Sequence, residues 1–263
     1  MGRIRRKISA GLPVWVEALF PQRLMRRIKE QLKLDGSGKV QQEHTVMRPG
    51  AEKAYEASQY HAEVFLHLSD EPGSRFGHMD IAFGRLVYSY GCYDSSSHRF
   101  FDMFSDGVLV VSPREAYIDY CLKQEKKVLI GYPLLLDQEQ EEVMKQKLRE
   151  FKRDLRIWRP NSFHYKHGEK VDISDAASKL QLAVGSRFFK VRRRKFKTYF
   201  VLGTNCALLV DECIGALGVE RITPRVGIIT PGACYRYFEN ALFHQRSIVA
   251  GRRVYLPDGG EKE

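Results

Sequence analysis

The sequence predicts an α+β fold in which helices pack against a central antiparallel sheet. Two apolar strand-like runs, 76–83 and 86–90, are separated only by Gly84-Arg85, which is the spacing of a tight hairpin. Other strand-like runs gather around this hairpin, and the helical segments lie outside the strand runs instead of alternating with them. That order favours the α+β class over a doubly wound parallel sheet.

Length and composition are those of an ordinary globular chain. The protein has 263 residues, of which 43% are hydrophobic and 29% are charged. A chain of this size can bury a sizeable core, and global disorder is not expected. We therefore expect a basic N-terminal helix and linker over residues 1–50, followed by one large domain over 51–263.

The N-terminal part predicts a helix, a break and the first strand. Apolar residues recur with helical spacing over 14–34, and Asp35-Gly36-Ser37-Gly38 then interrupts the pattern. The segment 39–50 is polar and is predicted to be a linker. The run 62–68 is rich in Val, Phe and Leu and is predicted to be the first strand.

After the hairpin, strands and helices are expected in turn. The run 108–111 predicts a short strand, and a helix is expected at Pro113 with Ser112 as its N-cap. The segment 127–134 returns as a strand. Asp137 then predicts the N-cap of a charged helix that ends near residue 153.

The C-terminal third contains one unassigned stretch and several clear elements. The segment 156–186 gives no dominant pattern. The expected elements are a cation-rich strand at 187–194, helices at 205–217 and 231–242, and closing strands at 246–249 and 253–256.

The positive charge predicts an acidic partner without naming it. The formal net charge is +11 and the pI is about 9.4. The densest basic run includes Arg192, Arg193, Arg194 and Lys195, with phenylalanines interleaved. Such a run could hold an anionic polymer or a membrane surface, or it could be a solvated edge that prevents aggregation. We regard specific nucleic-acid recognition as less favoured than the solvated edge.

The N-terminus resembles the basic region of a signal peptide but lacks a good apolar core. The apolar stretch 12–20 is short and contains Pro13 and Glu17. We expect a cytoplasmic protein. The basic helix at 14–34 could dock on the domain or lie on an anionic membrane, and the sequence leaves both open.

Cysteine usage predicts a reducing compartment. The five cysteines are odd in number, sparse for the chain length, and contain no CxxC pair. A disulfide framework and a structural zinc site are therefore not expected. No cofactor and no metal are expected either.

One cysteine stands where a nucleophile would be useful. Cys206 follows Gly203-Thr204-Asn205 and opens an apolar helical run, and Asn205 and Thr204 are natural N-cap residues. Unpaired amides and the helix dipole stabilise negative charge at a helix start, so a thiol there ionises more easily. A nearby imidazole could exchange a proton with it, and the same amides could stabilise an oxyanion. The alternative is a small buried hydrophobe, as expected for Cys121, Cys213 and Cys234.

Two segments together resemble the permuted NlpC-like branch of the papain-like superfamily. Gly77-His78 leads into the strand hairpin, and Asn205-Cys206 follows much later at a helix start. Relatives of lecithin:retinol acyltransferase and the PPPDE peptidases have both elements in this order. Tyr199 resembles the aromatic residue that precedes the cysteine motif, and Thr230-Pro231-Gly232 resembles a helix start of several bacterial members.

This resemblance implies a circularly permuted papain-like domain with a Cys206–His78 pair. It also implies an insertion, around 137–184, because the two motifs are far apart. The third polar residue should lie on the strand after the histidine strand or just beyond it, where Asp94, Ser89 and Tyr90 are the candidates.

The predicted activity is cleavage or transfer at an amide or ester bond of a peptide or acyl substrate. Peptidase or amidase chemistry is favoured over acyl transfer. The alternative is a papain-like module without efficient catalysis that binds an anionic polymer or a membrane. The sequence does not predict the oligomeric state.

Overall fold

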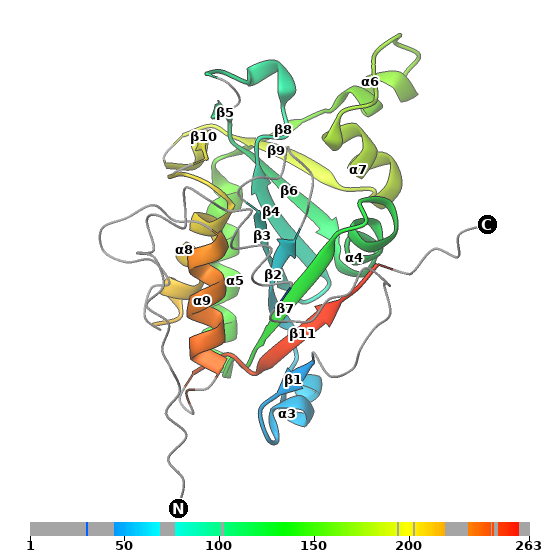
Figure 1. Ribbon diagram of the computed structural model, residues 1–263. Coiled ribbons are helices and arrows are strands. Elements are labelled where there is room, and N and C mark those ends of the chain that lie inside the picture. The colour runs from blue at the N-terminus through cyan, green and yellow to red at the C-terminus, as the bar shows by residue number, and fades with distance from the viewer. Residues whose placement is uncertain are drawn as a thin grey trace, which may run out of the picture.

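A nine-stranded sheet forms the centre of the protein (Figure 1). The computed structural model describes residues 30, 45–68, 77–100, 103–193, 195–201, 203–218, 231–242, 244 and 247–257. Neighbouring strands of the sheet run antiparallel, in the order β1-β11-β7-β2-β3-β4-β6-β9-β8. The strands are β1 (Val46–Met47), β2 (Ala62–Leu68), β3 (His78–Phe83), β4 (Leu86–Gly91), β6 (Val108–Pro113), β7 (Val128–Leu134), β8 (Leu155–Trp158), β9 (Arg187–Val191) and β11 (Gly251–Tyr255).

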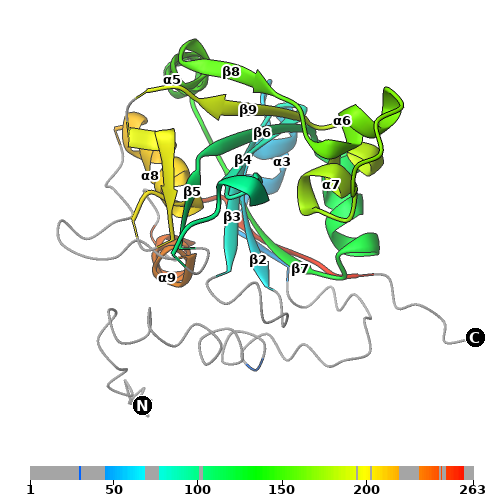
Figure 2. The same cartoon turned by 90° about the horizontal axis from the view of Figure 1, so that it is seen from above.

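Helices cover both faces of this sheet, as the view from above shows (Figure 2). One face carries α5 (Gln138–Arg153), α8 (Cys206–Ala216) and α9 (Pro231–Leu242). The other carries α4 (Arg114–Asp119), which continues as η4 (Tyr120–Gln124), with α6 (Asn161–Lys166) and α7 (Ala176–Val184). The short helix α3 (Ala51–Ala57) lies beside β1, and β5 (Phe104–Asp106) pairs with β10 (Thr198–Phe200) as a separate ribbon. The predicted α+β class with an antiparallel sheet is confirmed.

The alternation of side chains along β3 divides the core in two. Met79, Ile81 and Phe83 belong to the cluster under α5, α8 and α9, whereas Ala82 belongs to the cluster under α4 and α7. Side chains two residues apart on a strand share a face. Asp80 therefore lies on the α4 face of the sheet, among the residues of the second cluster.

The hairpin and the charged helix form as predicted. Gly84 adopts φ +59, a left-handed conformation that glycine accepts at no steric cost, and it lets β3 turn into β4 within two residues. Asp137 and Gln140 make a reciprocal capping box at the start of α5, with Gln140 N 2.8 Å from Asp137 Oδ1. Local chemistry alone determines both features.

Other expected elements differ from the structure. Ser112 is not an N-cap, because β6 continues to Pro113 and the Ser112 hydroxyl bonds Ser186 instead. The unassigned stretch 156–186 contains most of β8, with α6 and α7, and β8 extends the sheet as an edge strand. The predicted helix at 14–34 lies outside the described residues except for Glu30, which is helical. Val46–Met47 joins the sheet through β11 and is not a free linker.

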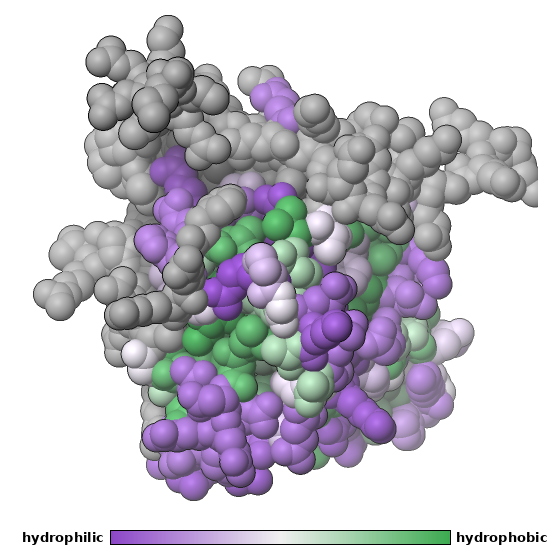
Figure 3. Space-filling model, turned by 90° about the horizontal axis from the view of Figure 1, so that it is seen from below, coloured by the Kyte–Doolittle hydropathy of each residue, from purple (hydrophilic) through white to green (hydrophobic). Residues whose placement is uncertain are grey.

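The end of the molecule that carries α3 and β1 is partly apolar (Figure 3). A groove there is lined by residues that include Val46, Met47, Leu135 and Leu242. Seen from below, hydrophobic residues gather in the middle of this face and hydrophilic residues border them.

None of the helices in the described part of the chain is both long enough and apolar enough to cross a membrane.

Candidate active site

Strand β3 presents a histidine and a carboxylate side by side. His78 opens the strand and Asp80 follows two residues later, so both side chains leave the same face. The Asp80 side chain is 0% exposed, whereas the His78 side chain is 28% exposed. His78 Nε2 lies 2.8 Å from Asp80 Oδ1. A buried carboxylate therefore fixes one edge of a partly exposed imidazole.

The second oxygen of Asp80 is held by two further residues. His67 Nε2 lies 2.6 Å from Asp80 Oδ2, and the Tyr117 hydroxyl donates to the same oxygen at 2.6 Å. His67 stands directly opposite His78 in the β2–β3 register, and Tyr117 belongs to α4. Three elements thus fix Asp80, and two histidines share its charge.

Ser89 completes the contacts of the His78 ring nitrogen. It pairs with Asp80 across β3 and β4, and its Oγ lies 2.8 Å from His78 Nε2. The Tyr93 hydroxyl lies 2.8 Å from the same Oγ. Because Nε2 faces Asp80 and Ser89, Nδ1 is the ring nitrogen left to face a reacting group.

The electrostatics favour a carboxylate beside a protonated imidazole. Burial alone would lower the pKa of His78, but the nearby Asp80 carboxylate and the Cys206 thiol raise that pKa well above its ordinary value. Burial would raise the pKa of Asp80, but the two histidines hold it well below its usual range. Burial lowers the pKa of His67 despite the same carboxylate. His78 is therefore the charged histidine and His67 the neutral one.

Cys206 meets this imidazole from the opposite face of the sheet. Asn205 caps α8, because its side chain accepts from Leu208 N at 3.2 Å and donates to Val201 O at 2.8 Å. Cys206 is the first residue of α8, which packs against β3, and its thiol lies within hydrogen-bonding reach of His78. Cys206 is only 2% exposed. A substrate can therefore reach the sulfur only after neighbouring side chains move aside.

Tyr199 and Thr204 shape the approach to the cysteine helix. The carbonyl of Thr204 accepts from Phe200 N at 2.9 Å and closes the turn between β10 and α8. The rings of Tyr199 and Tyr90 lie 5.7 Å apart between centroids. Burial, and then proximity to Cys206, raises the pKa of both tyrosines, so both stay neutral beside the thiol.

Of the three residues predicted to orient His78, only Ser89 touches it. Lys190 Nζ lies 2.5 Å from Asp94 Oδ2, and Asp94 also caps the turn at Ser96. The Tyr90 hydroxyl donates to the carbonyl of Phe196 at 2.9 Å. Asp94 and Tyr90 are therefore occupied elsewhere.

The residue that sequence reasoning missed is Asp80. Its signal was present in the His-x-Asp spacing, because strand periodicity puts those two side chains on one face. The resemblance implies an orienting residue on the following strand, so the prediction did not include Asp80.

The Gly77-His78 motif and the described part of the Thr230-Pro231-Gly232 motif of the resemblance also lie close together. Gly77 adopts φ +69, and a side chain there would come within 3.4 Å of Pro231 Cβ, at the start of α9. The start of α9 therefore packs against the residue that precedes His78. Thr230 lies outside the described residues.

The basic run is partly neutralised. Lys190 pairs with Asp94 and Asp106, and Lys195 Nζ lies 3.0 Å from Glu212 Oε1. Arg192 and Arg193 are exposed, and Arg194 lies outside the described residues. Of the four residues predicted to hold an anion, Arg192, Arg193 and Lys195 are described and exposed, and Lys195 is paired with Glu212.

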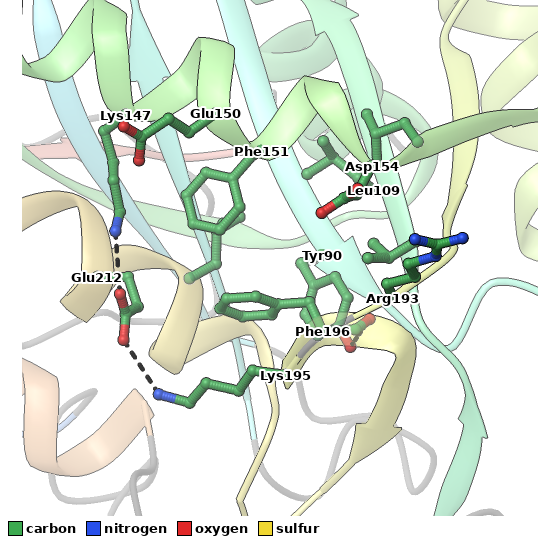
Figure 4. A pocket seen from close by; sticks show the side chains of 13 residues that line it. Tyr90, Leu109, Lys147, Glu150, Phe151, Asp154, Arg193, Lys195, Phe196 and Glu212 are labelled. Atoms are coloured by element: carbon green, nitrogen blue, oxygen red, sulfur yellow. Dashed lines mark hydrogen bonds and ion pairs between the residues drawn. The ribbon is translucent and has the colours of Figure 1, made fainter.

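A cavity of about 180 Å³ lies between α5, α8 and the segment after β9 (Figure 4). The rings of Phe151, Phe196 and Tyr90 form its apolar wall, with centroids 5.2 Å and 5.1 Å apart in the two adjacent pairs. Glu212 bridges Lys147 and Lys195 at its edge, at 3.1 Å and 3.0 Å. Neither Cys206 nor His78 lines this cavity.

In the site, the imidazole lies between the thiol and the carboxylate, and the available chemistry is that of these three groups. Among the described residues, no group of three or more His, Cys, Asp or Glu side chains is arranged to hold a metal ion. Comparisons with protein-family models, with curated proteins and with solved structures find no match for this chain.

Proposed function

We propose that this protein is a cysteine-dependent hydrolase or acyltransferase that acts on an amide or ester bond, with amide cleavage favoured. One observation carries the proposal: His78 contacts Cys206 at the start of α8 while Asp80 holds the opposite edge of the imidazole. A nucleophile, a base and a group that orients the base are the minimum for covalent acyl transfer.

In the proposed acylation step, the sulfur of Cys206 attacks the substrate carbonyl carbon. The sulfur has already given its proton to His78, which is the charged histidine of the site, and amides in the first turn of α8 stabilise the oxyanion. His78 then protonates the leaving nitrogen or oxygen, the carbon–heteroatom bond breaks, and a thioester remains. Asp80 keeps the imidazole in place and stabilises its charge, as an orienting carboxylate does in related catalytic triads.

Deacylation follows the same route in reverse. Water, or an acceptor alcohol or amine, gives its proton to His78 and attacks the thioester carbonyl. The carbon–sulfur bond breaks and the proton returns to Cys206. Hydrolysis and acyl transfer differ only in the acceptor, which is why both remain within the proposal.

We also propose that the fold is a circularly permuted papain-like domain. The support is the chain order, with a histidine at the start of a central strand and a cysteine at the start of a later helix packed on that strand. From a papain-like fold, the reaction expected first is hydrolysis of a peptide bond.

The alternative of a non-catalytic module that holds an anionic polymer or membrane has less support. Such a module would use the basic run before Cys206. Lys190 and Lys195 of this run already form ion pairs with acidic side chains. The positive charge that remains in this run is what is expected of a solvated sheet edge.

The test is labelling of cysteines with iodoacetamide, followed by mass spectrometry. Cys206 is expected to react fastest of the five cysteines, and His78→Ala should slow that reaction at least about 100-fold, which is the lower end of the range for loss of a general base. Cys213, on the same helix, is the internal control, because burial raises its pKa to about 12.

Two outcomes would contradict the proposal. One is equal, slow labelling of all five cysteines in the wild type. The other is fast labelling of Cys206 that His78→Ala leaves unchanged, because the imidazole would then have no part in activating the thiol.

A further inference from the structure

A cavity of about 250 Å³ opens beside His78 on the α4–α7 side of the sheet. Its lining includes His78, Tyr93 and Tyr199, together with residues of η4 and α7. Cys206 does not line it, and α8 lies on the other face of the sheet. The imidazole therefore stands between the nucleophile and this cavity.

The charged groups and three tyrosine hydroxyls of the cavity already have partners. The hydroxyls of Tyr117 and Tyr93 bond Asp80 and Ser89. At the far end, the Tyr120 hydroxyl donates to Glu125 at 2.8 Å, and Lys127 pairs with the same carboxylate at 2.6 Å. A charged ligand would find no unpaired counter-charge on these groups. Aromatic faces and the side chain of Leu180 provide apolar contact.

We infer that this cavity binds the leaving group of the substrate, and that the leaving group carries an uncharged aromatic or branched alkyl side chain. The inference rests on the proposed function. The acyl carbon stays bonded to sulfur, while the leaving atom must come within reach of the imidazole that protonates it. The leaving group therefore departs on the His78 side, where the cavity lies.

The size of the cavity sets the size of the group. A cavity of about 150 Å³ lined by apolar residues is enough for benzene. The space beside His78 thus suits one aromatic ring with a short linker. Phenylalanine and leucine amides fit this description, whereas aspartate and lysine would bring an unpaired charge into the cavity.

The experiment measures acceptor preference, because the site that releases the leaving group also receives the acceptor by microscopic reversibility. Enzyme acylated with p-nitrophenyl acetate is offered phenylalaninamide, leucinamide, glycinamide, aspartic acid amide and lysinamide. The N-acetyl products are then quantified. Phenylalaninamide and leucinamide are expected to be acetylated roughly tenfold or more faster than glycinamide, since one methylene is worth about tenfold or more in an apolar pocket.

A variant ties this preference to the cavity. Ala176 lines the cavity at the exposed start of α7, so Ala176→Phe should fill space without disturbing the core. The preference for phenylalaninamide should fall to near that for glycinamide. Leu182→Phe is the matched control, because Leu182 is exposed on the same helix and does not line the cavity.

The outcomes separate the two proposals. The inference is supported when Ala176→Phe removes the preference for phenylalaninamide and Leu182→Phe leaves that preference intact. An acyl-enzyme at Cys206 that treats all acceptors alike, or a preference that Ala176→Phe does not alter, overturns the inference and leaves the proposed function standing. Absence of any acyl-enzyme at Cys206 overturns the proposed function and the inference with it.

Discussion

Asp80 is the residue that organises the candidate site. A fully buried carboxylate is costly unless it is paired and hydrogen-bonded, and Asp80 has His78, His67 and Tyr117 as partners. Only His78 of these three approaches Cys206, so the other two secure the carboxylate and leave His78 to exchange protons. In the proposed mechanism, Asp80 acts on the reaction through His78.

Asp80→Asn should shift the alkaline limb of the acylation rate to lower pH. The carboxylate raises the pKa of His78, so its removal lowers that pKa, and the imidazole loses the proton that the leaving group needs at a lower pH. The measurement is the pH profile of acylation by an amide substrate, together with NMR titration of the His78 ring.

Asp94→Asn is the matched control, because Asp94 pairs with Lys190 instead of the imidazole. Its pH profile should follow that of the wild type. An unshifted alkaline limb in Asp80→Asn would remove the carboxylate from the mechanism.

At the scale of elements, a second buried network positions α4, the helix that carries Tyr117. Arg114, the first residue of α4, pairs with Glu63 on β2 and donates to the Tyr55 hydroxyl of α3 at 3.2 Å. The Tyr255 hydroxyl of β11 donates to Glu63 at 3.0 Å. Four elements therefore meet at one ion pair on the α4 side of the sheet.

Removing both members of this pair should cost less stability than the sum of the two single removals. Glu63→Gln or Arg114→Met alone leaves a buried charge without its partner and should lower the free energy of unfolding by about 3–5 kcal/mol. The double variant should lose less than the sum of the single losses, because neither charge remains. Urea unfolding of the four proteins measures the coupling, and strictly additive losses would contradict it.

Prediction from the sequence succeeded where local chemistry decides the structure. The Gly84-Arg85 turn, the Asp137 cap and the Asn205 cap each depend on a few neighbouring residues, and each forms as expected. The edge strand β8 and the helices α6 and α7 were not found, because they are short and gain their stability from β9 and the sheet.

The site was partly predictable for the same reason. Cys206 has a local signal, namely the helix start after Asn205, and His78 has the glycine turn before a strand. Asp80 also has a local signal, the His-x-Asp spacing on one strand. The contacts that His67 and Ser89 add depend on the register of β2, β3 and β4, which is a long-range property that residue type alone does not predict.

At the scale of the whole molecule, the site joins the two hydrophobic clusters across the sheet. Cys206 belongs to the cluster under α8, and Tyr117 to the cluster under α4. His78 and Asp80 lie between them at the end of a central strand. Because the charges of the site are buried where both layers meet, their protonation is linked to the stability of the entire domain.

The difference in unfolding free energy between wild type and Asp80→Asn should therefore be bell-shaped against pH. The depressed pKa of Asp80 contributes stability above the unfolded value of about 3.9, and this is lost as pH falls through the folded pKa. The raised pKa of His78 contributes stability below about 6.5, and this is lost as pH rises through its folded pKa. Urea unfolding from acid to alkaline pH measures both limbs, and a difference that does not vary with pH would refute the linkage.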